Sequence, residues 1–248
     1  MLNIYIYDGT FEGLLSSVFD AWNDKDIYSI RTTNENKEVN LLENLITIET
    51  REEKADRIIK WVNNKAGYEV LRKLYRVYLT ENPDRGIFIF RYLKLIQKFG
   101  KNTENNLAHK DVINVNKLSS LHTSETRRLY GFVRFDVLSN DILFAQIEPE
   151  YNQLEIVAPF FADRYYGNPW IIHDTKRKTA AIFDGRQYII TESDNNMPTQ
   201  TTQSDRAFKE MWVDYLGALT IKERLNLELQ QKFVPLKIRK YLTEFNFK

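Results

Sequence analysis

The spacing of apolar residues changes once along this chain, and that change most constrains its fold. Between about residues 50 and 126, apolar side chains recur every three or four positions, as in Val70, Leu74 and Tyr78. Such spacing predicts amphipathic helices. From residue 129 onward the apolar residues form short runs separated by turn residues, which predicts strands. The two patterns together predict an α+β protein.

The second half is expected to supply the sheet. Residues 130–135 and 142–147 are predicted to form a hairpin around the turn at 139–141. Further strands are expected at 169–173, 179–183 and 187–191. We therefore expect a central mixed or antiparallel sheet flanked by helices, with a largely helical insertion in the first half.

The N-terminal segment has a different pattern. Residues 2–7 alternate apolar and polar side chains and predict a strand, and Thr10 is a candidate N-cap for the helix that follows. Thr50-Arg51-Glu52-Glu53 has the form of a capping box and predicts the start of another helix. An active-site role for Asp8-Gly9-Thr10 is the alternative to a simple turn.

Helices are expected around and after the second-half strands. A helix is predicted at 151–164, where Pro159 should kink or split it. Thr220-Ile221-Lys222-Glu223 forms a second capping box that predicts a fresh helix. The helix before it carries an apolar stripe that we expect to be buried, formed by Phe208, Met211, Trp212, Tyr215, Leu216 and Leu219.

At 248 residues the chain is long enough for one large domain. We expect a single α+β domain over 1–248. Its parts are a helical subregion at about 50–126, a strand-rich core at about 127–192 and C-terminal helices at about 204–243.

The chain has no cysteine, which excludes disulfides, thiolate metal sites and a thiol nucleophile. Its three histidines are scattered and form no zinc motif, and neither a nucleotide-binding glycine loop nor a serine nucleophile elbow is present. We therefore expect no metal and no cofactor. No signal peptide or membrane-spanning run is evident, so we expect a soluble, cytoplasmic protein.

Five polar residues near predicted element ends are candidate catalytic residues: Glu148, Asp163, Arg164, His173 and Asp174. A histidine titrates near neutral pH and suits a general base. His173 and Asp174 are adjacent on a predicted strand and should point to opposite faces, so a direct pair is not expected. The alternatives are a histidine bonded inside the sheet, an Asp174 that caps the following turn, and a structural salt bridge at Asp163.

Basic residues gather in the second half of the chain. With nearby aromatic side chains, they are candidates for holding a phosphate backbone and stacking bases. The alternative is a solvated basic face over an aromatic core. The candidate nucleic-acid-binding residues are Arg128, Arg134, Lys176, Arg177, Lys178 and Arg224.

Several ordered blocks resemble the bacterial "probable DNA metabolism protein" family, a domain-of-unknown-function family. The blocks begin with Tyr7-Asp8-Gly9-Thr10-Phe11-Glu12-Gly13 and Gly131-Phe132-Val133-Arg134-Phe135. They continue with Ala145-Gln146-Ile147-Glu148-Pro149, Phe161-Ala162-Asp163-Arg164, Trp170-Ile171-Ile172-His173-Asp174, Ile221-Lys222-Glu223-Arg224-Leu225-Asn226 and Lys240-Tyr241-Leu242. The chain departs from the family at the tail, with Val234-Pro235 and Ile238-Arg239 where the family tends to have Met-Pro and an aromatic pair.

The resemblance implies a role in DNA metabolism without naming a reaction. Members of that family often occur beside a putative DNA-modification or repair radical-SAM protein, and some are fused to a uracil-DNA glycosylase domain. Our leading hypothesis is a nucleic-acid-binding accessory protein in DNA repair or DNA metabolism. The alternatives are an enzyme acting on a damaged base, nucleotide or phosphodiester, and a non-catalytic scaffold for a glycosylase or radical-SAM partner. The sequence does not define the oligomeric state.

Overall fold

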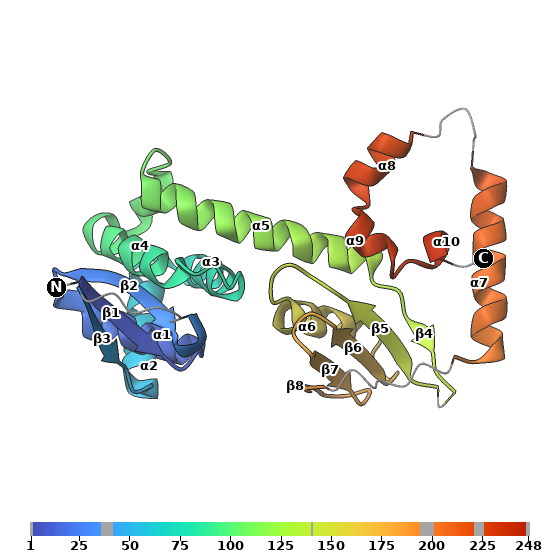
Figure 1. Cartoon of the computed structure of the whole chain (residues 1–248), viewed down its shortest axis with the longest axis horizontal. Helices are drawn as coiled ribbons and strands as arrows, with labels where there is room; N and C mark the ends of the chain where they lie inside the picture. Colours follow the sequence, from blue (N-terminus) through green and yellow to red (C-terminus); the bar gives the residue numbers. More distant parts are fainter. Residues whose placement is uncertain (1, 36–41, 140, 194–200, 221–225, 247–248) are drawn as a thin grey trace. The chain divides into compact units, whose positions relative to one another are not determined.

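The computed structural model describes residues 2–35, 42–139, 141–193, 201–220 and 226–246. The chain divides into two compact units, Met1–Thr123 and Ser124–Lys248, which we call unit 1 and unit 2 (Figure 1). The single-domain expectation stays a prediction. The boundary between the units lies close to residue 127, where the strand-rich core was expected to begin. The α+β class is confirmed, with a sheet in each unit.

Unit 1 is built on a three-stranded parallel sheet in the order β2-β1-β3. Strand β1 (Leu2–Tyr7) pairs with β2 (Ile27–Thr32) on one side and β3 (Glu43–Thr47) on the other. Parallel neighbours need a crossover, and α1 (Phe11–Asp20), extended by a 3₁₀ turn at Ala21–Asn23, connects β1 to β2. The expected N-cap is confirmed, because Gly13 N donates to Thr10 Oγ1 at 2.9 Å. A second 3₁₀ turn, Thr33–Glu35, follows β2.

The helices of unit 1 share one core with that sheet. They are α2 (Glu52–Ala66), α3 (Tyr68–Leu79) and α4 (Arg85–Phe99), followed by a 3₁₀ segment at Gly100–Asn105 and by the first part of α5 (Lys110–Phe132), a helix that continues past the unit boundary at Thr123. Val62, Leu74 and Leu93 are buried together with side chains of α1 and the sheet. This is the helical region that the apolar spacing predicted.

The capping box expected at Thr50 does not form. The N-cap of α2 is Arg51, which makes no side-chain cap hydrogen bond. Thr50 Oγ1 instead donates to Asp8 Oδ2 at 2.8 Å. The Thr50 hydroxyl therefore links the segment after β3 to the turn between β1 and α1, instead of capping a helix. Local residue spacing does not predict this tertiary contact.

The strand predicted at 130–135 is wrong for its first part, because α5 continues to Phe132. The buried positions Ser119, His122, Thr126 and Leu129 follow one another at helical spacing. The first three are polar, so a search for apolar periodicity overlooks the stripe. A strand, β4 (Asp136–Val137), begins just after the predicted segment.

Unit 2 contains the five-stranded mixed sheet, in the order β4-β5-β6-β7-β8. Strands β5 (Leu143–Ile147) and β6 (Trp170–Asp174) are parallel, and the other neighbours are antiparallel. Strands β7 (Thr179–Phe183) and β8 (Tyr188–Glu192) lie close to their predicted positions. The helix between β5 and β6, α6 (Leu154–Arg164), covers one face of the sheet through a core that includes Val157, Phe161 and Trp170.

Pro159 does not split α6, which is one helix from Leu154 to Arg164. A proline inside a helix removes one backbone donor. The buried residues of α6, which include Leu154 before Pro159 and Phe161 after it, keep both halves of the helix against the sheet.

The C-terminal region is helical, as expected. It contains α7 (Gln203–Leu219), α8 (Leu227–Phe233), α9 (Leu236–Arg239) and α10 (Thr243–Asn246). The second predicted capping box falls mostly on residues 221–223, outside the described residues. Within the described part of the chain, no helix has the length and apolar character needed to cross a membrane.

The prediction that the α7 stripe is buried is wrong for most of its members. Phe208, Met211, Tyr215 and Leu219 are exposed, with Phe208 at 61%. The spacing correctly predicted which side chains share a face of the helix. It did not determine whether another element covers that face, because helical periodicity reports only the arrangement within α7.

Candidate nucleic-acid interface

The sheet of unit 2 has one face covered by α6, and two pockets include residues of its other face. On β5, Ala145 and Ile147 belong to the core formed with α6. Because successive strand residues alternate in direction, Phe144 and Gln146 lie on the other face. Both pockets include Gln146 and Tyr241 in their walls.

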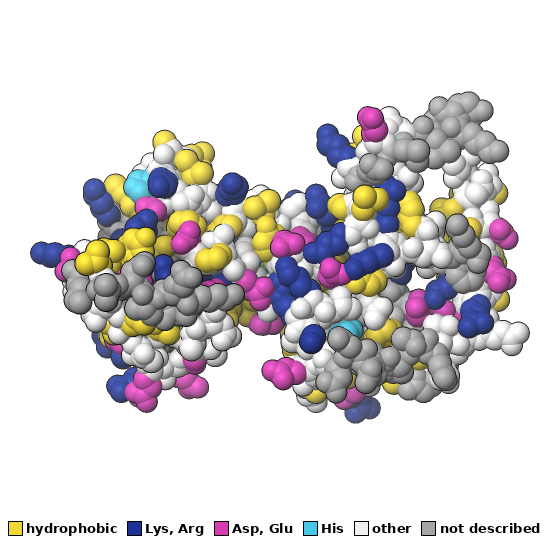
Figure 2. Space-filling model, viewed as in Figure 1, with side chains coloured by type: hydrophobic (Ala, Val, Ile, Leu, Met, Phe, Trp, Pro, Cys, Tyr) yellow, Lys and Arg dark blue, Asp and Glu magenta, His cyan; other side chains and the backbone are white. Residues whose placement is uncertain are grey.

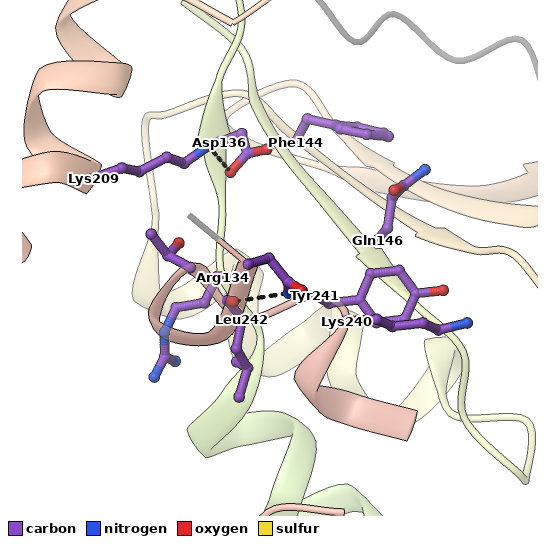
Figure 3. Close-up of a pocket in the computed structure, with 10 residues that line it drawn as sticks. Arg134, Asp136, Phe144, Gln146, Lys209, Lys240, Tyr241 and Leu242 are labelled. Carbon is purple, nitrogen blue, oxygen red and sulfur yellow. Dashed lines mark hydrogen bonds and ion pairs between the residues drawn. The ribbon is translucent and has the colours of Figure 1, made fainter. Parts of the chain in front are cut away.

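We call the first the Lys209 pocket; it has a volume of about 200 Å³. Figure 3 shows Phe144 and Gln146 projecting from β5, Lys209 reaching across from α7, and Lys240 and Tyr241 side by side. Arg134 and Asp136 complete its charged lining.

The charges of the Lys209 pocket are satisfied internally. Lys209 Nζ lies 2.7 Å from Asp136 and 2.8 Å from Asp205, and Arg134 lies 3.4 Å from Glu244. Burial alone would lower the pKa of Lys209, but the hydrogen bonds to the two carboxylates raise it overall. Asp205 also accepts from Val137 N at 3.1 Å. These contacts hold α7 against β4, and α10 against the segment that precedes β4. The charged residues therefore have a structural role.

The second pocket, which we call the Phe132 pocket, is smaller and more apolar, at about 140 Å³. Its walls come from the end of α5, the end of β5 and the segment around α9. The apolar lining residues are Leu129, Phe132, Val133, Ile147, Pro149, Pro235, Ile238 and the ring of Tyr241. Its charged lining residues are Glu125, Arg128, Glu148 and Lys237.

Basic side chains line the Phe132 pocket or pair with carboxylates at or near it, and we call Arg128, Lys176, Lys237 and Lys240 the basic surface. Lys176 and Lys237 both contact Glu150, at 3.1 and 3.3 Å, while Lys240 is bonded to Glu148 in the pocket wall. Figure 2 shows lysine and arginine side chains gathered over α9 and the end of α5.

The carboxylates among these cations do not immobilise them. The Lys176, Lys237 and Lys240 side chains remain 39–49% exposed, and exposed ion pairs contribute only about 0–1 kcal/mol each. Arg128 is exposed and has no ion pair within the described residues. A phosphate can therefore replace these carboxylate partners at little cost in free energy.

The five candidate catalytic residues do not share a pocket. Glu148 lines the Phe132 pocket, and hydrogen bonds from Lys240 and Tyr241 hold its pKa below the usual range. Asp163 and Arg164 are exposed at the end of α6, on the opposite side of the sheet.

The adjacent pair on β6 occupies two different environments, as the strand geometry predicted. Asp174 caps the following turn, accepting from Lys176 N at 3.0 Å and pairing with Arg177 at 3.0 Å. His173 is 2% exposed and faces the Gln146 side, and neither ring nitrogen has a hydrogen-bond partner in the described structure. Burial lowers the pKa of His173, an effect that Asp174 partly opposes.

The candidate nucleic-acid-binding residues are likewise divided. Arg128 and Lys176 belong to the basic surface, whereas Arg134 lines the Lys209 pocket. Arg177 is largely buried, and its guanidinium binds Asp174 and the carbonyl oxygens of Pro149 and Glu150. Lys178 is exposed in the turn, and Arg224 lies outside the described residues.

The residues that sequence reasoning missed come from separate parts of the chain. Phe132 and Gln146 were read as parts of strands, and Lys237, Lys240 and Tyr241 lie in the C-terminal segment, outside the residues named as nucleic-acid-binding candidates. Pro235 was a usable local signal, because it starts α9 and so sets where Lys237 and Ile238 lie. Within the described residues, no group of three histidine or carboxylate side chains is arranged to hold a metal ion.

The fold and the two pockets define an α+β protein whose second unit combines a mixed sheet with a basic, pocketed face. Residues 83–244 match the model of the family described as a domain of unknown function, DUF4130, and the chain belongs to that family. No curated protein and no solved structure matches the chain.

Proposed function

We propose that this protein binds nucleic acid and acts as an accessory protein in DNA repair or DNA metabolism. The observation that carries the proposal is the basic surface, in which Arg128 and Lys237 line one apolar pocket, Lys240 pairs with Glu148 of its wall, and Lys176 shares Glu150 with Lys237. Lysine and arginine side chains bind phosphates and release counterions, which provides affinity without a preformed catalytic group.

The test is a titration of fluorescently labelled single- and double-stranded DNA at increasing salt. If the four cations of the basic surface contact phosphates, the logarithm of the binding constant for a single strand should fall with a slope of about −3, since each contact contributes about −0.7. Binding that is absent even at about 50 mM salt contradicts the proposal.

A triple variant, Arg128→Gln with Lys176→Gln and Lys237→Gln, should reduce the magnitude of that slope by about 2. Arg177 is left unchanged because it binds Asp174 inside the fold. The matched control, Arg164→Gln with Arg186→Gln and Lys60→Gln, removes the same charge from exposed positions outside the basic surface. Equal loss in both variants would show that net charge alone drives binding, and would argue against this surface.

A scaffold role is the second candidate, favoured by the exposed apolar stripe on α7. Exposed apolar patches often mark protein-binding sites. Under this proposal the partner is a uracil-DNA glycosylase or a radical-SAM protein, and the interaction should be lost in the variant Phe208→Glu with Tyr215→Glu. Sedimentation of the purified proteins tests it, and the absence of a complex with either partner class contradicts it.

The enzyme alternative has weaker support, because its candidate residues are separated. It required several of Glu148, Asp163, Arg164, His173 and Asp174 to converge in one accessible pocket. Glu148 lines the Phe132 pocket. Asp174 instead accepts a hydrogen bond within the turn after β6, and Asp163 lies at the end of α6.

A further inference from the structure

The Phe132 pocket suggests which part of a nucleic acid the protein recognises. We infer that it receives one unpaired nucleobase from a single strand whose phosphates lie on the basic surface. This inference rests on the proposed function and deepens it, because a basic surface by itself does not distinguish single strands from duplexes.

The lining of the pocket suits a flat, largely apolar group. Phe132 and Tyr241 contribute aromatic rings, and Leu129, Val133 and Ile238 contribute aliphatic surface. Every base has a π face, so stacking on aromatic side chains tolerates any sequence. The pocket is therefore suited to a base without selecting one by shape.

The size of the pocket limits its occupant. Its volume of about 140 Å³ is well below the roughly 300–1,000 Å³ typical of sites for drug-sized ligands. A single ring system is the class of group that matches it. A base held in a duplex cannot enter without unpairing, so this geometry favours a single strand.

Gln146 provides a polar group for the edge of such a base. Gln146 lies in the wall between this pocket and the Lys209 pocket, since it lines both, and its amide has no hydrogen-bond partner within the described residues. An amide carries both donors and an acceptor, so it can pair with complementary groups on a base edge. Leaving those groups unmatched in an apolar site is unfavourable, which gives the amide a preference for a polar-edged ring over a purely apolar one.

The basic surface places phosphates next to the opening. Arg128 and Lys237 are themselves part of the pocket wall, and Lys176 shares Glu150 with Lys237. A backbone that contacts these cations passes directly by the pocket, so that a base attached to it reaches Phe132.

The experiment compares a short oligothymidine with an oligonucleotide of the same length whose sugars and phosphates are kept but whose bases are missing, and with a duplex. Both phosphate backbones bear the same charge. The intact strand should bind about ten-fold or more tightly than the abasic strand, as expected for one stacked base. It should also bind more tightly than the duplex at the same salt concentration.

Two variants assign the effect to the pocket. Gln146→Leu retains side-chain size and removes the amide, and Phe132→Leu retains an apolar wall and removes the ring. Both should reduce the ratio of intact to abasic affinity while leaving the salt dependence unchanged. Arg128→Gln should have the opposite pattern, with a smaller salt slope and an unchanged ratio.

Failure of this inference is distinguishable from failure of the proposed function. Equal binding of intact and abasic strands, or a preference for the duplex, overturns the nucleobase pocket and leaves nucleic-acid binding in place. No binding of any oligonucleotide at low salt overturns both. Competition by a tryptophan-containing peptide, combined with equal binding of intact and abasic strands, would assign the pocket to a protein partner instead.

Discussion

His173 is a titratable side chain in an almost fully buried position. Its imidazole is buried in unit 2 on the Gln146 side of the sheet, and neither ring nitrogen has a hydrogen-bond partner in the described structure. Burial lowers its pKa, so the neutral form is the one that the fold accommodates. His173 therefore lowers the free energy of unfolding in acid, because the unfolded chain binds a proton there more readily than the folded chain. Its buried ring is not accessible as a general base.

This predicts an acid-dependent loss of stability. The unfolded chain binds a proton on His173 near pH 6.5, whereas the folded chain, with its lowered pKa, does so only at lower pH. The free energy of unfolding should thus decline below about pH 6.5, until the folded pKa is reached. In His173→Leu this decline should be smaller.

Urea unfolding at several pH values measures the difference. An unchanged pH dependence in His173→Leu would contradict the assignment.

At Gly86, α4 packs so closely against β2 that there is no room for a side chain. A Cβ at this position of α4 would lie 2.3 Å from the carbonyl oxygen of Ile30 and 2.8 Å from its Cβ. Gly86→Ala should therefore lower the free energy of unfolding by about 1–3 kcal/mol, the usual cost of overpacking. Denaturant titration measures this loss.

Gly217 in α7 is the matched control, because a Cβ there meets nothing within 4 Å. Gly217→Ala should leave stability unchanged or increase it slightly, since alanine favours a helix. Similar losses in both variants would show that the approach of α4 to β2 is less close than described.

At the scale of elements, α5 shows how tertiary contacts extend a helix. Leu129 is buried in the core of unit 2, and the ring of Tyr130 stacks on Phe160 of α6 with centroids 4.1 Å apart. These contacts stabilise helical backbone where residue types common in strands occur.

The extension is testable at Gly131, which lies in the last turn of α5, where an added Cβ would meet no atom within 4 Å. In a helix, Gly131→Ala should raise the free energy of unfolding by roughly 0.5–1 kcal/mol. Alanine would also replace glycine favourably in a strand, so Gly131→Val is the discriminating variant: valine should be less stable than alanine in a helix and more stable than alanine in the strand that the sequence pattern predicts. Thermal unfolding of both variants distinguishes the two outcomes, and a valine variant more stable than the alanine variant would contradict the helical assignment.

At the scale of the whole molecule, the described residues form two separate hydrophobic cores. One is formed by buried residues of unit 1, including Leu14, and the other by buried residues of unit 2, including Ile172. Truncating either side chain to alanine should cost about 2–5 kcal/mol in its own core.

Hydrogen exchange tests whether the two units unfold separately. If the cores are independent, Leu14→Ala should accelerate exchange in residues 2–123 alone, and Ile172→Ala should accelerate it in the second unit alone. Loss of protection throughout the chain in both variants would instead favour the single domain that the sequence analysis expected.

Sequence alone determined the features that depend on neighbours in the chain. The strand at residues 2–7, the Thr10 cap and the helices of the first half follow from side-chain period and from hydrogen bonds between residues close in sequence. The opposite orientation of His173 and Asp174 also followed from strand geometry.

Only the tertiary structure decided which faces are covered and which side chains meet. It left the α7 stripe exposed, moved Thr50 to Asp8, and joined Phe132, Gln146 and Ile238 in one pocket. The physical reason is that periodicity specifies directions around one element, whereas burial and pockets depend on what packs against it from distant parts of the chain. The sequence therefore identified Arg128 and Lys237 as charged residues, but it did not predict that both line one pocket.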